Sequence, residues 1–166
     1  MPCACRAPIE TYPENAEWGP LFWKLLHSFA ELSGKQININ LQKDEIRLWI
    51  NILDGLKLIL PCDICRTHYS EWLLNHPIEV LSTMNYSETN YWIRNYLWSL
   101  HNTINEGNNK PEIVFEDLSK LYKDVNIRTT WKALEPVMKK VITLNGVSLL
   151  NWKKWLSHVR TIEGMY

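Results

Sequence analysis

Two cysteines separated by two residues, Cys62 and Cys65, are the side chains in this sequence best suited to redox chemistry. Pro61 precedes them and a helical pattern follows, so the two thiols are expected one turn apart at the start of a helix. The dipole and the unpaired N–H groups at a helix start favour the thiolate form of the first cysteine. Because a thiolate attacks disulfides and electrophilic cofactors, the pair is suited to forming and breaking a disulfide.

A Cys-x-x-Cys pair also fits two other kinds of site. Half of a zinc site needs two more ligands at compatible spacing, and only His68 and His76 follow nearby, without a second Cys-x-x-Cys or a His-x-x-x-His pair. Cys3 and Cys5 would join such a site only through an unusual, distant arrangement. A thioredoxin fold places the motif in a β-α-β setting, for which the sequence has no strands. The dithiol motif alone therefore leaves redox and metal chemistry open.

The elements that position these residues have the apolar periodicity of helices, and no strand pattern or internal repeat stands out. The expected helices span residues 18–33, 44–60, 62–75, 85–107, 115–123, 130–144 and 148–162. The expected helix-end signals are Pro20 and Gly34 for the first helix, Asp44 as the N-cap of the second, Asn85 with Glu88 as a capping box, and Pro136 as an interruption. Short connections favour antiparallel neighbours, so the predicted fold class is all-α.

The composition excludes several classes of partner. Among 166 residues, 18 Lys and Arg balance 18 Asp and Glu, so neither nucleic acid nor an anionic membrane surface is an expected partner. No stretch approaches the roughly 20 apolar residues that span a bilayer. Residues 1–6 lack the apolar core of a signal peptide and the Arg-rich run of a transit peptide, which predicts a soluble intracellular protein. Nine tryptophans exceed the needs of a core of this size and suggest indole rings placed for something flat.

Two further strings place polar and aromatic side chains on single helical faces. WGPLFWKLLH puts Trp23 and His27 four residues apart, and HNTIN puts His101 and Asn105 four apart. Lys-Pro follows the second string, and a short helical element comes after it. Each string is weakly specific by itself, and their order along the chain is the informative feature.

The order Trp-x-x-x-His, Pro-Cys-x-x-Cys, His-Asn-x-Ile-Asn and Lys-Pro resembles the Erv/ALR family of sulfhydryl oxidases over about residues 18–122. The resemblance implies a four-helix bundle plus a short fifth helix that binds FAD beside the dithiol. It divides the chain into an N-terminal tail with the Cys-x-Cys pair (1–16), an FAD-binding oxidase domain (17–123) and a helical C-terminal extension (124–166). The Gly-Pro-x-Phe-Trp form of the first string is more similar to viral than to mitochondrial members, which implies the host cytoplasm or the virion.

The resemblance also implies a set of FAD-binding residues. Carried over by position, these are Gly19, Trp23, His27, Cys65, His101, Asn102, Asn105, Lys110 and Tyr122. Lys110 would approach the adenosine or phosphate portion, and Tyr122 stands where the family usually has Trp. The residue types agree with this role, because a flavin needs flat apolar surfaces for its rings and a few fixed donors for its polar edges. No metal is required.

In the implied reaction, Cys65 faces the flavin and Cys62 meets incoming thiols. Electrons from a protein dithiol, thioredoxin-like or from another viral or cellular thiol protein, pass to molecular oxygen and give hydrogen peroxide. Family members often relay electrons through a second, flexible cysteine pair, so Cys3 and Cys5 are a possible shuttle. Members of the family are also commonly homodimers, which implies a homodimer here. A structural disulfide frequent in the family cannot form, because no cysteine follows Cys65.

A non-enzymatic helical interaction module is the alternative, with the Cys-x-x-Cys pair as a structural clip or half of a zinc site. Residues 126–166 lie outside the resemblance, and they could cover an exposed face, alter a dimer interface or bind a protein partner.

Overall fold

The computed structural model describes residues 11–166, and every regular element in that range is helical. The α-helices are α1 (Asn15–Leu32), α2 (Ile39–Ile59), α3 (Asp63–Asn75), α4 (Thr89–Gly107), α5 (Leu118–Tyr122), α6 (Ile127–Thr143) and α7 (Leu149–Glu163). Three short 3-10 segments lie between them at Ile78–Ser82, Tyr86–Glu88 and Phe115–Asp117. The predicted all-α class is confirmed. None of the helices in residues 11–166 combines the length and the apolar character needed to cross a membrane.

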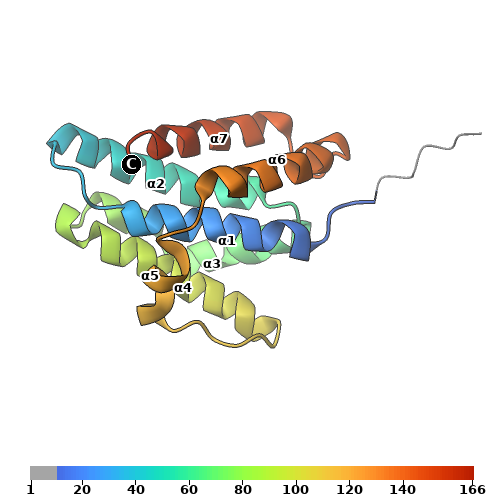
Figure 1. Cartoon of the computed structure of the whole chain (residues 1–166), viewed down its shortest axis with the longest axis horizontal. Coiled ribbons are helices and arrows are strands. Elements are labelled where there is room, and N and C mark those ends of the chain that lie inside the picture. The colour runs from blue at the N-terminus through green and yellow to red at the C-terminus, as the bar shows by residue number, and fades with distance from the viewer. Residues whose placement is uncertain (1–10) are drawn as a thin grey trace, which may run out of the picture.

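The helices pack as two neighbouring sets (Figure 1). Helix α1 packs against α4, α5 and α6, whereas α2 packs against α3 and α7. The last two helices thus lie along the first two, on one side of the bundle. This arrangement covers the apolar stripes of both α1 and α2 on a side that α3 and α4 leave free.

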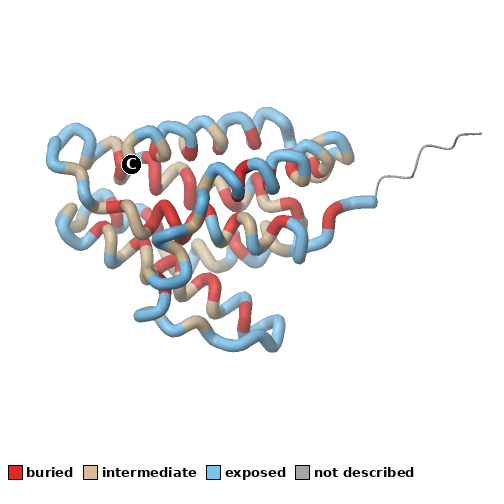
Figure 2. The backbone as a smooth tube through the Cα atoms, in the orientation of Figure 1, coloured by how far each residue is buried: buried red, intermediate tan, exposed pale blue. Residues whose placement is uncertain are grey.

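One hydrophobic core includes residues of α1, α2, α3, α4, α6 and α7. Figure 2 marks the buried positions along the chain. From the last two helices, Trp131, Trp152 and Trp155 are each at most 7% exposed and belong to the same cluster as Phe22 and Trp49. The residues predicted to form a C-terminal extension are therefore part of the main core.

Helix α2 begins earlier than the sequence pattern predicts. Its N-cap is Asn38, whose side-chain oxygen accepts from the N–H groups of Asn40 and Leu41. The prediction of Asp44 as the cap is wrong, because Asn38 already supplies an acceptor to the free N–H groups of the first turn.

Two further predicted helix signals are wrong. Asn85 and Glu88 do not form a capping box; the N–H of Glu88 donates to the carbonyl of Asn85 at 2.9 Å, which closes a 3-10 turn before α4. Pro136 does not interrupt α6, which is continuous from Ile127 to Thr143. Both Pro136 and Lys132 are exposed, so water can serve the Lys132 carbonyl that lacks a helix donor.

The start and end of α1 follow recognisable signals. A capping box of Glu14 and Glu17 starts the helix three residues before the predicted start, so Pro20 lies beyond the first turn. Gly34 follows the C-cap with φ of 71°, where a Cβ atom would lie 2.9 Å from the backbone nitrogen of Asn90. Glycine is therefore required at this turn both by the backbone and by the close approach of α4.

A buried carboxylate ties the C-terminal residue to the bundle. Glu45 on α2 is fully buried, and it accepts hydrogen bonds from the hydroxyls of Tyr86 and Tyr166 and from the Gly34 N–H. The Tyr166 hydroxyl also accepts from the Trp49 indole N–H at 3.0 Å. Desolvation raises the pKa of Tyr166, so its hydroxyl stays protonated and can donate to the carboxylate.

Replacing Tyr166 by phenylalanine is expected to lower the free energy of unfolding by about 2 kcal/mol. The change removes one donor to a buried carboxylate and leaves the Trp49 N–H without its acceptor. Urea denaturation followed by circular dichroism measures the effect. Tyr91→Phe, at an exposed position, is the matched control; equal stability of the two variants would contradict the structural role of this hydroxyl.

Candidate active site

The dithiol lies where α2 ends and α3 begins. Cys62 is the N-cap of α3, in an extended conformation, and Cys65 follows in the first turn, with the two Cα atoms 5.1 Å apart and the sulfurs joined in a disulfide. The backbone N–H of Cys65 donates to the Cys62 sulfur at 3.2 Å. The predicted position of the pair at a helix start is thus confirmed, and the helix supplies a donor that stabilises a thiolate on Cys62.

Cys65 is also close to the start of α1. The side-chain amide nitrogen of Asn15 lies 3.8 Å from the Cys65 sulfur. Both cysteines are half-buried, whereas Asp63 and Ile64 between them are exposed. The disulfide therefore lies at the edge of the bundle, with solvent on one side and the first turn of α1 on the other.

Four of the predicted cofactor-binding residues gather in one cluster of rings. Trp23 of α1 stacks on His101 of α4, with ring centres 3.9 Å apart and planes 7° apart. His27 of α1 stacks on Tyr122 of α5 at 4.4 Å and 13°. The chain thus brings α1, α4 and α5 together through parallel rings, a packing suited to flat groups.

The two histidines of this cluster are hydrogen-bonded to each other. His27 Nε2 and His101 Nδ1 lie 3.1 Å apart, so one nitrogen donates while the other accepts. Burial, with the nearby His101 and Arg94, lowers the pKa of His27 to about 3. Burial and the nearby Lys110 lower the pKa of His101 to about 4. Both imidazoles are therefore neutral at pH 7, and each can offer one donor and one acceptor.

The histidine pair predicts acid sensitivity of the fold. Since an unfolded histidine has a pKa near 6.5, the unfolded state binds more protons than the folded state between about pH 4 and pH 6.5. The free energy of unfolding therefore has its full value above pH 6.5 and decreases as the pH falls. For a residue as buried as His27, the decrease at pH 5 is about 2 kcal/mol. Urea denaturation between pH 7 and pH 5 measures it. His27→Gln should reduce the change in the free energy of unfolding between pH 7 and pH 5, while His68→Gln at an exposed position should leave that change as it is. An equal change in the two variants would contradict the role given to His27.

The remaining predicted residues differ in how far their side chains are already engaged. A Cβ atom on Gly19 would meet nothing within 4 Å, so space lies open beside the α1 backbone there. The Asn102 amide both donates to and accepts from the backbone of Ile113, so it holds the segment after α4. Asn105 is buried and donates to the Pro111 carbonyl at 3.4 Å, while Lys110 is exposed.

The order of these motifs along the chain is that of a known family. The model of the Erv1 / Alr family matches residues 20–132, which is more than half of the chain. The chain belongs to this family. The predicted family resemblance is thus confirmed, and the match includes the dithiol and the ring cluster.

Individual relatives of this chain are viral proteins, in line with the predicted similarity to viral members. An FAD-linked sulfhydryl oxidase of African swine fever virus (isolate Pig/Kenya/KEN-50/1950) is 29% identical over 113 residues, which cover 68% of this chain and 85% of the relative. The proteins of the same name from isolates Tick/Malawi/Lil 20-1/1983 and Warthog/Namibia/Wart80/1980 are 28% and 27% identical over the same coverage. No solved structure gives a significant match.

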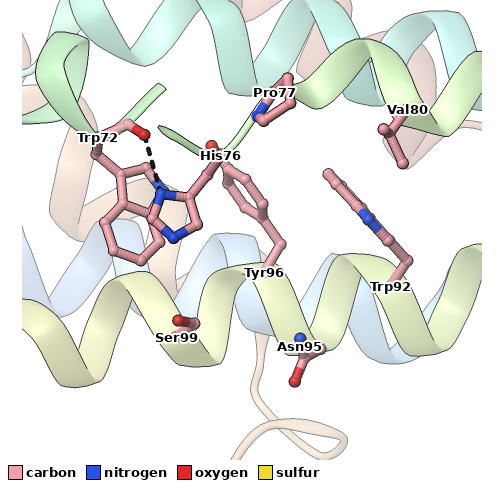
Figure 3. Close-up of a pocket in the computed structure, with 8 residues that line it drawn as sticks. All are labelled: Trp72, His76, Pro77, Val80, Trp92, Asn95, Tyr96 and Ser99. Carbon is pink, nitrogen blue, oxygen red and sulfur yellow. Dashed lines mark hydrogen bonds between the residues drawn. The ribbon is translucent and has the colours of Figure 1, made fainter. Parts of the chain in front are cut away.

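A cavity of about 240 Å³ lies between α3 and α4, and none of the predicted cofactor-binding residues lines it (Figure 3). Its walls include Trp72, which stacks on His76 at 3.5 Å, and Trp92, which stacks on Tyr96 at 5.0 Å. The Trp72 indole N–H and the Tyr96 hydroxyl are buried without a hydrogen-bond partner. His76 Nδ1 donates a hydrogen bond to the Trp72 carbonyl at 3.0 Å, which fixes this histidine as part of the wall.

The zinc interpretation of the dithiol finds no ligand set in the described part of the chain. Within residues 11–166, no three His, Cys, Asp or Glu side chains gather closely enough to hold a metal ion. His68 is exposed on α3. Cys3 and Cys5, the predicted shuttle pair, lie outside the described residues.

Sequence reasoning missed the residues that hold the turn before Cys62. Tyr12 donates a hydrogen bond to the Pro61 carbonyl, and Arg66 donates to the Leu60 carbonyl. Tyr12 lies 49 residues from its partner, and no local pattern marks either residue. Only the spacing of Arg66 three residues after Asp63, with which it forms an ion pair, is visible in the sequence.

Proposed function

We propose that this protein is an FAD-linked sulfhydryl oxidase that forms disulfides in protein substrates. The observation that carries the proposal is the Cys62–Cys65 disulfide at the first turn of α3, next to α1. The names of the viral relatives support the activity and the cofactor. The ring cluster supports the same cofactor, because it combines stacked planes and neutral donors on α4 and α5 with those on α1, the helix that contacts Cys65.

The residues present fit a flavin nucleotide. Trp23, His27, His101 and Tyr122 offer flat faces, and the neutral histidines supply donors and acceptors without adding charge. The open space beside Gly19 lets a ligand approach the α1 backbone, and the exposed Lys110 offers a cation for a phosphate. Asn105 would complete this set, whereas the amide of Asn102 serves the fold through Ile113.

The dithiol reacts with substrate in two exchange steps. A substrate thiolate attacks the Cys62 sulfur, the Cys62–Cys65 bond breaks, and Cys65 leaves as a thiolate. The second substrate thiol then displaces Cys62, which releases an oxidised substrate and a reduced pair. The Asn15 amide can donate to the Cys65 thiolate, and the Cys65 N–H can donate to the Cys62 thiolate.

A bound FAD would supply two-electron transfer from the reduced Cys62 and Cys65 pair to molecular oxygen, which would give hydrogen peroxide. Cys65 is assigned to the flavin side, since its sulfur lies next to α1, and Cys62 to the substrate side. A homodimer and a shuttle through Cys3 and Cys5 belong to the same proposal. The substrate is a protein with two neighbouring thiols.

The proposal is tested by the absorbance spectrum of the purified full chain. We expect a yellow protein whose flavin absorbance bleaches when dithiothreitol is added without oxygen, then recovers in air as peroxide forms. A colourless protein with stoichiometric zinc would instead support the non-enzymatic interaction module.

A further inference from the structure

The two residues before Cys62 are held by side chains from other parts of the chain. The Pro61 carbonyl accepts from the Tyr12 hydroxyl, and the Leu60 carbonyl accepts from the guanidinium of Arg66. Arg66 also pairs with Asp63 in the first turn of α3. The backbone just before Cys62 is thus fixed by hydrogen bonds that do not involve either cysteine.

The connection between α6 and α7 completes this arrangement. The Gly146 carbonyl accepts from Arg66 Nη1 at 3.2 Å. A Cβ atom on Gly146 would overlap the hydroxyl and ring of Tyr12, so Tyr12 packs directly on the Gly146 backbone. The connection itself is rigid, because Asn145 has a φ of 59° and the Gly146 N–H donates to the Val141 carbonyl at 2.9 Å, as in a helix C-terminal cap.

Two of these contacts come from outside the part of the chain that the family model matches. Tyr12 precedes the matched residues 20–132, and Gly146 follows them. The start of the described chain, the α2–α3 connection and the α6–α7 connection meet at one end of the bundle (Figure 1). The support of the dithiol turn is therefore built from segments added on both sides of the matched region.

We propose that Tyr12, Arg66 and Gly146 form a clamp that sets the redox equilibrium of the Cys62–Cys65 pair. These are positioning residues, because they contact the backbone before Cys62 and neither sulfur. The inference deepens the proposed function, on which its biological meaning rests, and assigns a role to the C-terminal extension.

The physical basis is preorganisation of the reduced pair. The redox equilibrium can be described by thiol–disulfide exchange with glutathione. In this exchange, two glutathione thiols become one glutathione disulfide while the Cys62–Cys65 bond becomes two thiols. Without that bond, the turn before α3 would gain freedom, and the two thiols would spend less time close together. A clamp that holds Leu60 and Pro61 limits this freedom, which raises the effective concentration of one thiol beside the other and favours the disulfide.

The test is the equilibrium of the full chain with mixtures of reduced and oxidised glutathione. After alkylation, mass spectrometry of the peptide that contains Cys62 and Cys65 gives the fraction reduced. Tyr12→Phe removes the hydrogen bond to Pro61, and Gly146→Ala displaces the Tyr12 ring. Each should lower the effective thiol concentration about three- to tenfold, since one hydrogen bond is lost in each case.

Two matched controls isolate the effect. Tyr91→Phe alters an exposed tyrosine, and Gly107→Ala adds a methyl group where nothing lies within 4 Å. The double variant Tyr12→Phe with Gly146→Ala should equal the stronger single variant, because both remove the same contact. If the effective thiol concentration of Tyr12→Phe lies within twofold of both controls, the proposed clamp is wrong. This outcome can be read even if Gly146→Ala fails to fold. The measurement needs neither flavin nor oxygen, so it stays informative if the protein proves not to be an oxidase.

Discussion

Replacing Cys65 by serine is expected to reduce thiol-driven oxygen consumption by on the order of a thousandfold or more, to the background rate. Serine cannot form the disulfide with Cys62, so the chain loses the bond that accepts electrons from substrate. Because Cys65 is assigned to the flavin side, this variant should also lack the long-wavelength absorbance that a thiolate beside an oxidised flavin produces. An oxygen electrode with dithiothreitol as substrate, together with an absorbance spectrum, measures both effects.

The companion variant Cys62→Ser separates the roles of the two cysteines. It should lose turnover equally, yet retain or strengthen the thiolate absorbance, because Cys65 is then free beside the flavin. Cys3→Ser is the matched control for removal of a cysteine, and it should keep its activity toward dithiothreitol, which reaches Cys62 without a shuttle. Normal turnover in Cys62→Ser or Cys65→Ser would exclude the assigned chemistry, and reversed spectra would exchange the roles of the two sulfurs.

Replacing Trp155 by alanine is expected to lower the free energy of unfolding by about 3–5 kcal/mol, a large part of the stability of a domain of this size. Trp155 on α7 is 2% exposed, and its indole N–H donates to the Ile52 carbonyl at 3.0 Å. The ring lies so close to Gly55 that a Cβ atom there would come within 2.6 Å of it. Alanine would leave a cavity between α7 and α2 and would remove the indole hydrogen bond to the Ile52 carbonyl.

Urea denaturation of Trp155→Ala and of Leu150→Ala provides the comparison for this position. Leu150 is on the same helix but 76% exposed, so its replacement should change stability by no more than about 0.5 kcal/mol. A loss below about 1 kcal/mol in Trp155→Ala would mean that α7 is a peripheral addition and not part of the core.

The sequence predicts the helices well because their apolar periodicity is local. The stripes of α1 and α7 and the turn at Gly34 follow directly from residue type and spacing. Helix starts are less predictable, since several polar residues compete as caps and only one is used. At α2, Asn38 supplies the acceptor and Asp44 pairs with Arg47 on the surface instead.

The site residues also divide into those that local spacing predicts and those that it does not. The spacing of Cys62 and Cys65 predicts the disulfide, and the i, i+4 pairs predict which faces carry Trp23 and His101. The Tyr12 contact with Pro61 was not predictable, because it joins segments 49 residues apart with no shared pattern. An amphipathic stripe shows that a helix is buried on one face, but it does not name the helix that covers it.

The packing of α7 on α2 also affects how the chain folds during its synthesis. Ile52 and Trp155 are 103 residues apart, and Gln36 and Met165 are joined across 129 residues. During synthesis, the apolar face of α2 therefore emerges from the ribosome long before the helix that covers it. Contacts with such large sequence separation slow folding. The nascent chain thus exposes the apolar face of α2 until α7 has been synthesised, and its dithiol turn lacks the Gly146 contact for nearly as long.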